Sequence, residues 1–340
     1  MNNIKFMKHF QFLLFTLLII ALPACKHEKS IDYEPVPVKI KRFDIALYNL
    51  DIYHISDSVE MLEKKFPNFF PQYSTNVISI GYPGQPGFGD RLTSFQTNKT
   101  IYEVSKRVEE VYSDVSDIEK QLSQAFGIYK HYFPGSIIPD VYSHISGFNQ
   151  SIITSGNFIS ISLDKYLGRN EPFYNMLYPP IPKYLQYNMY RGKIAPDVVY
   201  SLGALKYPFD KEKNNLLAHI IYQGKLKYFE KQLMPEINDT LLWGFTPEQL
   251  AFCQNSEESM WVYLIEQKLL FETDEITINK FVNEAPFTKD FTKDSPGQAV
   301  VWIGFQIIAD YMDRNKNITL SQLMENNNYQ GILNESRYNP

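Results

Sequence analysis

The sequence contains very little cysteine, because Cys25 and Cys253 are the only two in 340 residues. Cys25 lies in an N-terminal segment where its thiol is expected to carry a lipid, as described below. No intramolecular disulfide can then form, even in an oxidising compartment. A hydrophobic core must therefore stabilise the fold, and roughly 300 residues rich in tyrosine and phenylalanine are enough to build one.

The sequence also lacks a block of basic residues, internal repeats and low-complexity segments. Its formal net charge is −5, and removal of Lys5 and Lys8 with the N-terminal segment changes it to −7. A mildly acidic chain without clustered lysine or arginine does not have the electrostatic footprint of a protein that binds polyanions. We therefore expect no nucleic-acid partner.

Long apolar runs are confined to residues 1–24, where two lysines precede the stretch FQFLLFTLLIIAL. This run is short for a bilayer span and is typical of a signal peptide. It ends in Leu-Pro-Ala before Cys25, the pattern of a bacterial lipoprotein signal, which would make Cys25 the acylated first residue of the mature chain. An ordinary secretory signal or an anchor helix is the alternative. Attached acyl chains would hold the protein stably at the membrane, with the polar segment 25–38 as a tether.

Residues 39–205 combine strand and helix patterns. The segment IKRFDIALYNL (40–50) begins with strand-like alternation, which places Arg42 and Asp44 on one face and predicts an ion pair between them. The segment 57–70 is expected to form a helix that stops at Pro67. The segment 115–135 is expected to form a second helix, closed by Pro134-Gly135. The Gly- and Pro-rich segment 81–91 is expected to be a loop.

Two strand segments rich in β-branched residues follow, at 140–148 and 151–168, and the second contains a turn at 154–157. After this turn, isoleucines alternate with Ser160 and Ser162, so one face of the strand is apolar and the other carries hydroxyl groups. A half-solvated strand explains this alternation. An edge strand bordering a cleft, able to pair with an extended peptide, is the alternative.

Residues 206–340 are expected to be mainly helical, because three segments carry helix-start signals. Thr246-Pro247-Glu248-Gln249 combines an N-cap, a proline at the first helical position and a capping-box glutamine. Ser295 to Gln298 repeats this arrangement, and Thr319 with Gln322 forms a third capping box. The fold class is therefore α+β: one globular domain over 39–340, with a small N-terminal sheet and helices (39–205) followed by a helical part (206–340).

The helix LLAHIIYQGKLKYF (216–229) raises the question of a metal site. A zinc hydrolase places two histidines at i and i+4 on such a helix, with a glutamate between them that polarises the bound water. Here His219 stands at the first position, Ile220 replaces the base, and Gln223 replaces the second ligand. Glu257 or Glu258 on the following helix could supply a third ligand. One histidine, one amide and one carboxylate make a poor zinc site, and a partly buried, hydrogen-bonded histidine is the simpler interpretation.

Six segments occur in the order found in a known family. They are the lipoprotein signal, IKRFDIALYNLD, FISISLDKYLG, LLAHIIYQGKLKYF, EESMWVYLIEQKLL and SPGQAVVWIGFQIIADYM. Together they resemble the gliding motility lipoprotein GldB family over nearly the whole mature chain. The resemblance implies a cell-envelope lipoprotein associated with the machinery of gliding and protein secretion, without an established enzymatic activity. GldB-like proteins also occur in bacteria that do not glide.

A more distant resemblance concerns the fold. The order of the 216–229 helix and the two helical segments ESMWVYL and GFQIIADYM looks like that of predicted zinc proteases with H-E-x-x-H, which implies a zincin-like fold. Matched residue by residue, His219 falls on the first ligand, Ile220 on the base, Gln223 on the second ligand and Glu258 on the third. Two of these four positions have unsuitable chemistry, so the resemblance implies a vestigial metal site.

These observations predict a catalytically inactive, zincin-like scaffold, anchored by Cys25 and binding partners of the motility and secretion machinery. We expect no catalytic residue, no metal and no cofactor, and an outer-membrane location facing the periplasm. Two alternatives remain open: a divergent metal-dependent hydrolase, and a lipoprotein that binds glycan or peptidoglycan through some of its many aromatic residues.

Overall fold

The computed structural model describes residues 32–340, and Glu34–Pro340 form one compact unit. The predicted signal segment 1–24, Cys25 and the first part of the tether lie outside the described residues. The described end of the tether contacts the domain, because the Val36 amide donates to the Ser123 carbonyl at 3.0 Å. Within the described residues, no helix is both long and apolar enough to cross a membrane.

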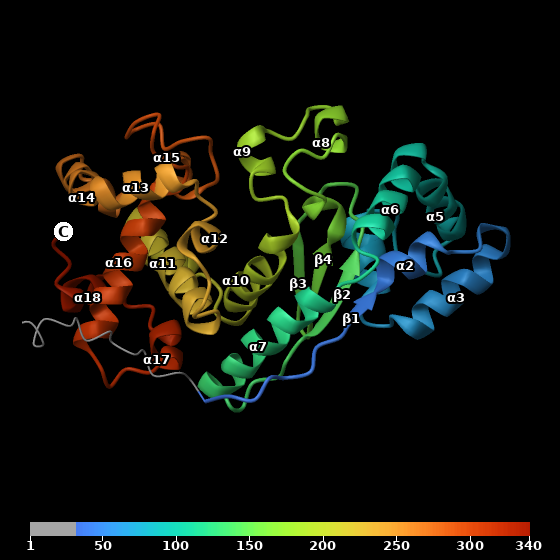
Figure 1. Ribbon diagram of the computed structural model, residues 1–340, viewed down its shortest axis with the longest axis horizontal. Helices are drawn as coiled ribbons and strands as arrows, with labels where there is room; N and C mark the ends of the chain where they lie inside the picture. Colours follow the sequence, from blue (N-terminus) through green and yellow to red (C-terminus); the bar gives the residue numbers. More distant parts are fainter. Residues whose placement is uncertain (1–31) are drawn as a thin grey trace, which may run out of the picture. The chain divides into compact units, whose positions relative to one another are not determined.

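A four-stranded sheet lies in the N-terminal part of the fold (Figure 1). Its strands are β1 (Ile40–Arg42), β2 (Asp140–His144), β3 (Ile152–Ser155) and β4 (Phe158–Ser162). The spatial order is β1-β2-β4-β3, in which β1, β2 and β4 are parallel and β3 is antiparallel to β4. Val141 pairs with Ile40 on one side and with Ile159 on the other, and nearly all residues of the two central strands are buried.

Helices from the first third of the chain cover one face of this sheet (Figure 1). They are α2 (Phe43–Tyr48), α3 (Ile55–Lys65), α4 (Phe70–Gln72), α5 (Phe88–Thr97) and α6 (Lys99–Val111). An aromatic core joins them to the strands: the Phe69 ring stacks on Tyr142 with centroids 4.7 Å apart and meets Phe158 edge-on at 5.4 Å. Burial of these large rings supplies much of the hydrophobic stabilisation of this half.

On the other side, α7 (Ser116–Tyr132) and α10 (Ile194–Lys206) connect the sheet to the helical half. The short helices α8 (Phe173–Met176) and α9 (Lys183–Gln186) lie between them in sequence and project above the sheet in Figure 1. Short segments of 3₁₀-helix connect several of these elements and those of the helical half: Ile52–His54, Leu163–Tyr166, Arg191–Lys193, Lys211–Lys213 and Leu269–Phe271. Tyr73–Val77 forms a π-helical turn after α4.

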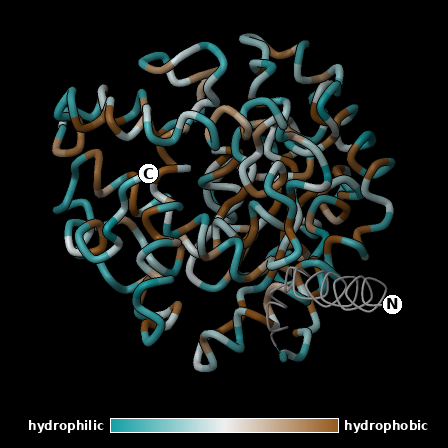
Figure 2. The backbone as a smooth tube through the Cα atoms, turned by 60° about the vertical axis from the view of Figure 1, so that its left-hand side comes forward, coloured by the Kyte–Doolittle hydropathy of each residue, from teal (hydrophilic) through white to brown (hydrophobic). Residues whose placement is uncertain are grey.

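The C-terminal half is built around α11 (Leu216–Leu233), which packs most extensively against α16 (Ala299–Arg314). The other helices here are α12 (Asp239–Trp243), α13 (Pro247–Asn255), α14 (Glu257–Glu266), α15 (Glu275–Val282), α17 (Leu320–Glu325) and α18 (Tyr329–Ser336). In Figure 2 hydrophobic and hydrophilic residues alternate along most helices, as expected where each helix buries one face. Most residues of α11 are buried, so it is a central helix of this half.

The predicted α+β class is confirmed, with a small sheet in the mixed part and helices from 206 onward. The helix predictions at 57–70 and 115–135 correspond to α3 and α7, which end at Lys65 and Tyr132 before Pro67 and Pro134. The loop prediction for 81–91 is only partly correct, because α5 begins at Phe88, after Gly87 in the left-handed conformation.

Two of the three predicted helix starts are confirmed. Thr246 with Gln249 and Thr319 with Gln322 each form a complete capping box. The prediction at Ser295 is wrong: α16 begins at Ala299 after Gln298, whose φ is 61°, and this helix has no side-chain cap. The Ser295 hydroxyl instead donates to the Thr292 carbonyl and accepts from the Thr288 amide, so it holds the preceding loop together.

Both interpretations of the hydroxyl-bearing strand are wrong. β4 is a central strand paired on both sides, and all its residues are buried. Its hydroxyl groups are satisfied internally: Ser160 pairs with Nδ1 of His144 at 2.7 Å, and Ser162 donates to Asp164 at 2.6 Å. Burial lowers the pKa of His144 to about 3 and raises the pKa of Asp164. Sequence alternation alone could not separate a solvated polar face from one that contacts a buried polar network.

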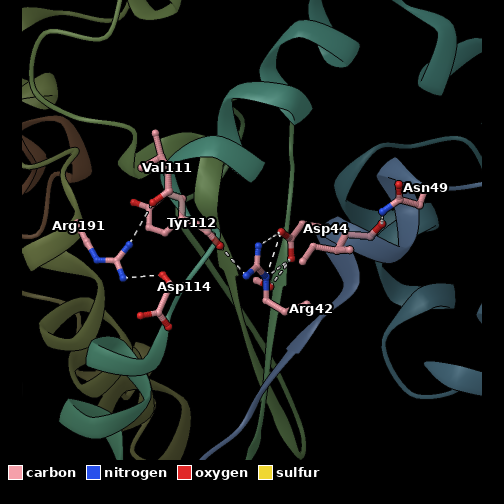
Figure 3. A network of polar contacts seen from close by, with 9 residues as sticks. Arg42, Asp44, Asn49, Val111, Tyr112, Asp114 and Arg191 are labelled. Atoms are coloured by element: carbon pink, nitrogen blue, oxygen red, sulfur yellow. Dashed lines mark hydrogen bonds and ion pairs between the residues drawn. The ribbon is translucent and has the colours of Figure 1, made fainter.

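The predicted ion pair between Arg42 and Asp44 is present, at 2.6 Å, but Asp44 is not on a strand. The strand ends at Arg42, and Asp44 lies in the first turn of α2, where its side chain is 2% exposed. Arg42 also donates to the Tyr112 carbonyl (Figure 3), and the Ser143 hydroxyl donates to Asp44. The pair therefore links β1, α2, β2 and the end of α6 inside the fold.

Candidate functional site

A cleft of about 840 Å³ lies between the sheet-bearing half and the helical half. One wall is α9 with the residues up to 188, and the other is the loop after α15, which supplies residues 283–286 and 296–298. The remaining lining comes from α10 with the preceding Lys193, from α11, from residues 243–249 at α12 and α13, and from Val301 of α16. In Figure 1 the two walls stand on either side of this region. The volume is in the range of sites for small ligands.

Two lysines at this cleft are paired with carboxylates and with the end of a helix. Lys193 lies 3.3 Å from Asp197 and donates to the Leu241 carbonyl at 3.1 Å. Lys227 lies 2.8 Å from the fully buried Glu230 and donates to the Leu242 carbonyl at 2.7 Å. Both ammonium groups thus satisfy carbonyls near the C-terminus of α12, where positive charge is favourable.

Burial and charge act in opposite directions on these groups. Desolvation lowers the pKa of Lys193, but Asp197 and Glu230 outweigh it, so the pKa is raised. For Lys227, desolvation is stronger than attraction to Glu230, and the pKa is lowered. Desolvation also raises the pKa of Glu230, against the effect of both lysines. Within residues 32–340, Oε1 of Glu230 has no hydrogen-bond partner, which makes its charged form costly in this buried position.

Gln223, the predicted second-ligand position, lines this cleft. Its Oε1 accepts a hydrogen bond from the Tyr200 hydroxyl, and the ammonium of Lys227 lies 4.9 Å from the Tyr200 ring centroid. Desolvation raises the pKa of Tyr200, so its hydroxyl stays protonated and keeps donating to Gln223. The amide nitrogen of Gln223 has no partner within residues 32–340, which leaves it as a donor at the cleft surface.

His219 has a different set of partners, although it lies one turn before Gln223 on α11. Its Nε2 is 2.7 Å from Oδ1 of Asn214, and its ring packs on Phe209 with centroids 4.2 Å apart. Desolvation lowers its pKa. His219 is therefore the partly buried, hydrogen-bonded histidine of the simpler interpretation, and it is not among the residues that line the cleft.

The predicted third-ligand position, Glu258, is exposed on α14. Its neighbour Glu257 points into the fold, where it accepts hydrogen bonds from Trp302 at 2.9 Å and from Tyr338 at 2.8 Å. Among residues 32–340, no group of three His, Cys, Asp or Glu side chains is arranged to hold a metal ion. The donors at the predicted ligand positions therefore do not fit a zinc site.

Ile220, at the position of the general base, is fully buried. α16 approaches so closely here that a Cβ on Gly304 would overlap the backbone of Ile220. A side chain at position 220 therefore contributes to the packing between α11 and α16, and isoleucine has no group that accepts a proton from water.

The sequence interpretation missed the paired charges Lys193, Asp197, Lys227 and Glu230. A signal was present: lysine and glutamate recur within the apolar helix 216–233, and Lys193 and Asp197 are spaced at i and i+4. Charges inside an apolar helix pattern indicate buried pairs or a cleft. The pattern could not show that residues from α10 and α11 meet beside α12.

Comparisons with known proteins give one match. A family model described as "Gliding motility protein GldB" matches residues 24–340. Neither the curated proteins nor the solved structures contain a match. The match covers the sheet, both halves and the cleft, so the whole described fold lies within one family region.

Proposed function

The chain belongs to the family of the gliding motility protein GldB, which consists of motility-related lipoproteins, and from this membership we propose a non-catalytic binding role in the cell envelope. In this proposal, Cys25 carries the lipid anchor, the domain faces the periplasm from the outer membrane and binds a partner of the motility or secretion machinery, and the cleft is a non-catalytic binding site. Neither catalysis nor a bound metal takes part.

One observation carries the proposal: Gln223 is bonded to Tyr200 and Ile220 is buried, at the positions where a zinc hydrolase needs its second ligand and its base. A neutral amide is a weak zinc ligand, and isoleucine cannot activate water. The resemblance to zinc proteases therefore supports, at most, a shared helix arrangement. A cleft without this chemistry is suited to binding rather than to hydrolysis.

Site-specific photo-cross-linking in intact cells tests the binding role. A photoreactive residue in place of Tyr184, which lines the cleft, should give one defined adduct with an envelope component. The same residue in place of Tyr53, which is 90% exposed and outside the cleft, should not give this adduct. Equal adducts from both positions, or an adduct with an unrelated protein, would contradict the proposed role of the cleft.

Metal analysis tests the non-catalytic part separately. After incubation with zinc and dialysis, purified protein should contain no stoichiometric zinc, and His219→Ala should not change this result. One zinc per chain in the wild type, lost in His219→Ala, would show that a working metal site exists. The Glu258→Gln variant provides a second check. Its zinc content should equal that of the wild type, because the exposed Glu258 carboxylate is not expected to bind metal.

A further inference from the structure

We propose that the cleft binds an uncharged glycan, an oligosaccharide whose hydroxyl and acetamido groups are recognised by side chains. This inference rests on the proposed non-catalytic binding function and specifies the chemistry of the ligand. It depends on four properties of the cleft: its charge balance, its free hydrogen-bonding groups, its aromatic side chains and the elements that line it.

The charges around the cleft balance. Three lysines are Lys183, Lys193 and Lys227, and three acidic residues are Asp197, Glu230 and Glu284, where Glu230 lies behind the lining and is fully buried. The ammonium groups are also occupied: Lys193 and Lys227 bind carboxylates and α12 carbonyls, and Lys183 donates to Gln186 at 3.0 Å. An anionic ligand would have to compete with carboxylates for Lys193 and Lys227, so these two lysines do not favour one.

The groups left free at the cleft are mostly neutral. The amide nitrogen of Gln223, the side-chain amides of Asn283 and Gln298, and the Tyr184 hydroxyl all line the cleft, and none has a hydrogen-bond partner within residues 32–340. Amides and phenols both donate and accept hydrogen bonds. Sugar hydroxyls also do both, so a glycan can satisfy these groups without introducing a charge.

Aromatic side chains complete the lining. Tyr184 and Tyr187, on the α9 wall, are partly exposed, whereas Trp243 and Phe245, which stack with centroids 5.8 Å apart, are buried and support the lining from behind. The Tyr187 ring is fixed in place by the Arg169 guanidinium, 4.1 Å from its centroid. Rigid rings offer apolar faces for the C–H surface of a sugar ring, while their polar edges keep contact with water.

The elements at the cleft argue against an extended peptide as the ligand. Extended peptides are commonly bound by addition to an exposed sheet edge, which supplies main-chain hydrogen bonds. The lining of this cleft comes from helices and loops, and residues of β1 to β4 do not contribute to it. A peptide therefore cannot bind here by addition to the sheet, and recognition at this cleft uses side chains, as glycan recognition does.

Calorimetric titration of the purified domain tests the inference with two probes: a tetramer of N-acetylglucosamine, and a synthetic peptidoglycan stem peptide without sugar. The tetramer should bind saturably and the peptide should not. Tyr184→Ala and Gln223→Leu should each weaken sugar binding about tenfold through loss of a ring contact or hydrogen bond. The matched controls Tyr53→Ala and Asn170→Ala change exposed residues outside the cleft and should leave binding unchanged.

The outcomes separate this inference from the proposed function. Binding of the peptide alone, absence of sugar binding in the folded wild type, or equal binding by wild type and both cleft variants would overturn the glycan inference while leaving the non-catalytic role intact. Mass spectrometry of the sugar after incubation provides the other arm. Shortened sugar would confirm the ligand class but overturn the non-catalytic role. Thermal melting of each variant shows that it is folded before its binding is interpreted.

Discussion

Gly224 of α11 and Gly304 of α16 lie where the two helices cross, and the backbone at Gly304 occupies the space that a Cβ on Gly224 would need. In the reverse direction, a Cβ on Gly304 would overlap the Ile220 carbonyl. Two glycines therefore allow the central helices of the C-terminal half to approach at backbone distance. Gln223 is adjacent to Gly224 in α11, so the crossing lies next to a residue that lines the cleft.

Gly224→Ala tests the importance of this crossing. Alanine favours an isolated helix, but here its methyl group would push α16 away, and we expect the free energy of unfolding to fall by about 3 kcal/mol. Denaturant unfolding measures this loss. Gly135→Ala is the matched control, since no atom lies within 4 Å of the position that its methyl group would take, and the change should be nearly neutral. Equal effects of the two substitutions would contradict the close approach.

The buried pair Arg42–Asp44 gives a second prediction. Asp44→Ala leaves the Arg42 guanidinium, which is 16% exposed, without its carboxylate, and should lower the free energy of unfolding by about 3 kcal/mol. Glu60→Ala removes the partner of Lys64 in an exposed ion pair and should have no measurable effect on chemical denaturation. A small effect at Asp44 would mean that the network in Figure 3 does not persist in solution.

Lys225 predicts a pH dependence of stability. Its ammonium is buried and donates to the Met324 and Asn326 carbonyls, and burial lowers its pKa from 10.5 to about 8. Because the folded pKa is lower than the unfolded one, the unfolded chain binds more protons between these values, and stability rises with pH across this window. Relative to Lys225→Met, the wild type should gain about 3 kcal/mol between about pH 8 and pH 10.5.

The control for this comparison is Lys120→Met, which changes an exposed lysine. Its unfolding free energy should follow the wild-type pH profile. If Lys225→Met also follows that profile, the Lys225 pKa is not shifted in the folded state, and its burial against α17 is incorrect.

The helix starts give a prediction that separates a cap from a loop contact. Thr246→Ala should cost about 1 kcal/mol and increase hydrogen exchange at the Gln249 amide, to which the threonine hydroxyl is bonded. Ser295→Ala should cost about 2 kcal/mol for a different reason, the loss of buried loop hydrogen bonds. Its exchange effect should appear at the Thr288 amide. Faster exchange confined to the first turn of α16 would instead restore Ser295 as its cap.

Anchoring is tested at Cys25, which lies outside the described residues. Cys25→Ala should leave the protein unprocessed or release it from the membrane fraction, because acylation requires the thiol. Cys253→Ala removes the other cysteine, which is buried in α13, and should leave membrane partitioning unchanged. Normal processing and membrane attachment of Cys25→Ala would contradict the lipoprotein interpretation.

Local signals in the sequence predicted the elements that depend on neighbouring residues. The prolines that follow α3 and α7 and the capping boxes at Thr246 and Thr319 act over three or four residues, so their effect can be derived without the fold. Ser295 shows the limit of this approach. It has the same local pattern, but loop contacts with Thr288 outweigh the cap, and α16 starts later.

The sequence by itself determined the α+β composition, the helical C-terminal half and the unsuitable chemistry at Ile220 and Gln223, because each follows from residue type and short-range order. Only the tertiary structure decided that β4 is central, that its serines contact buried His144 and Asp164, and that Lys193 and Lys227 meet beside α12. These features require segments distant in sequence to come together. Their positions depend on packing between helices and strands, which residue periodicity does not encode.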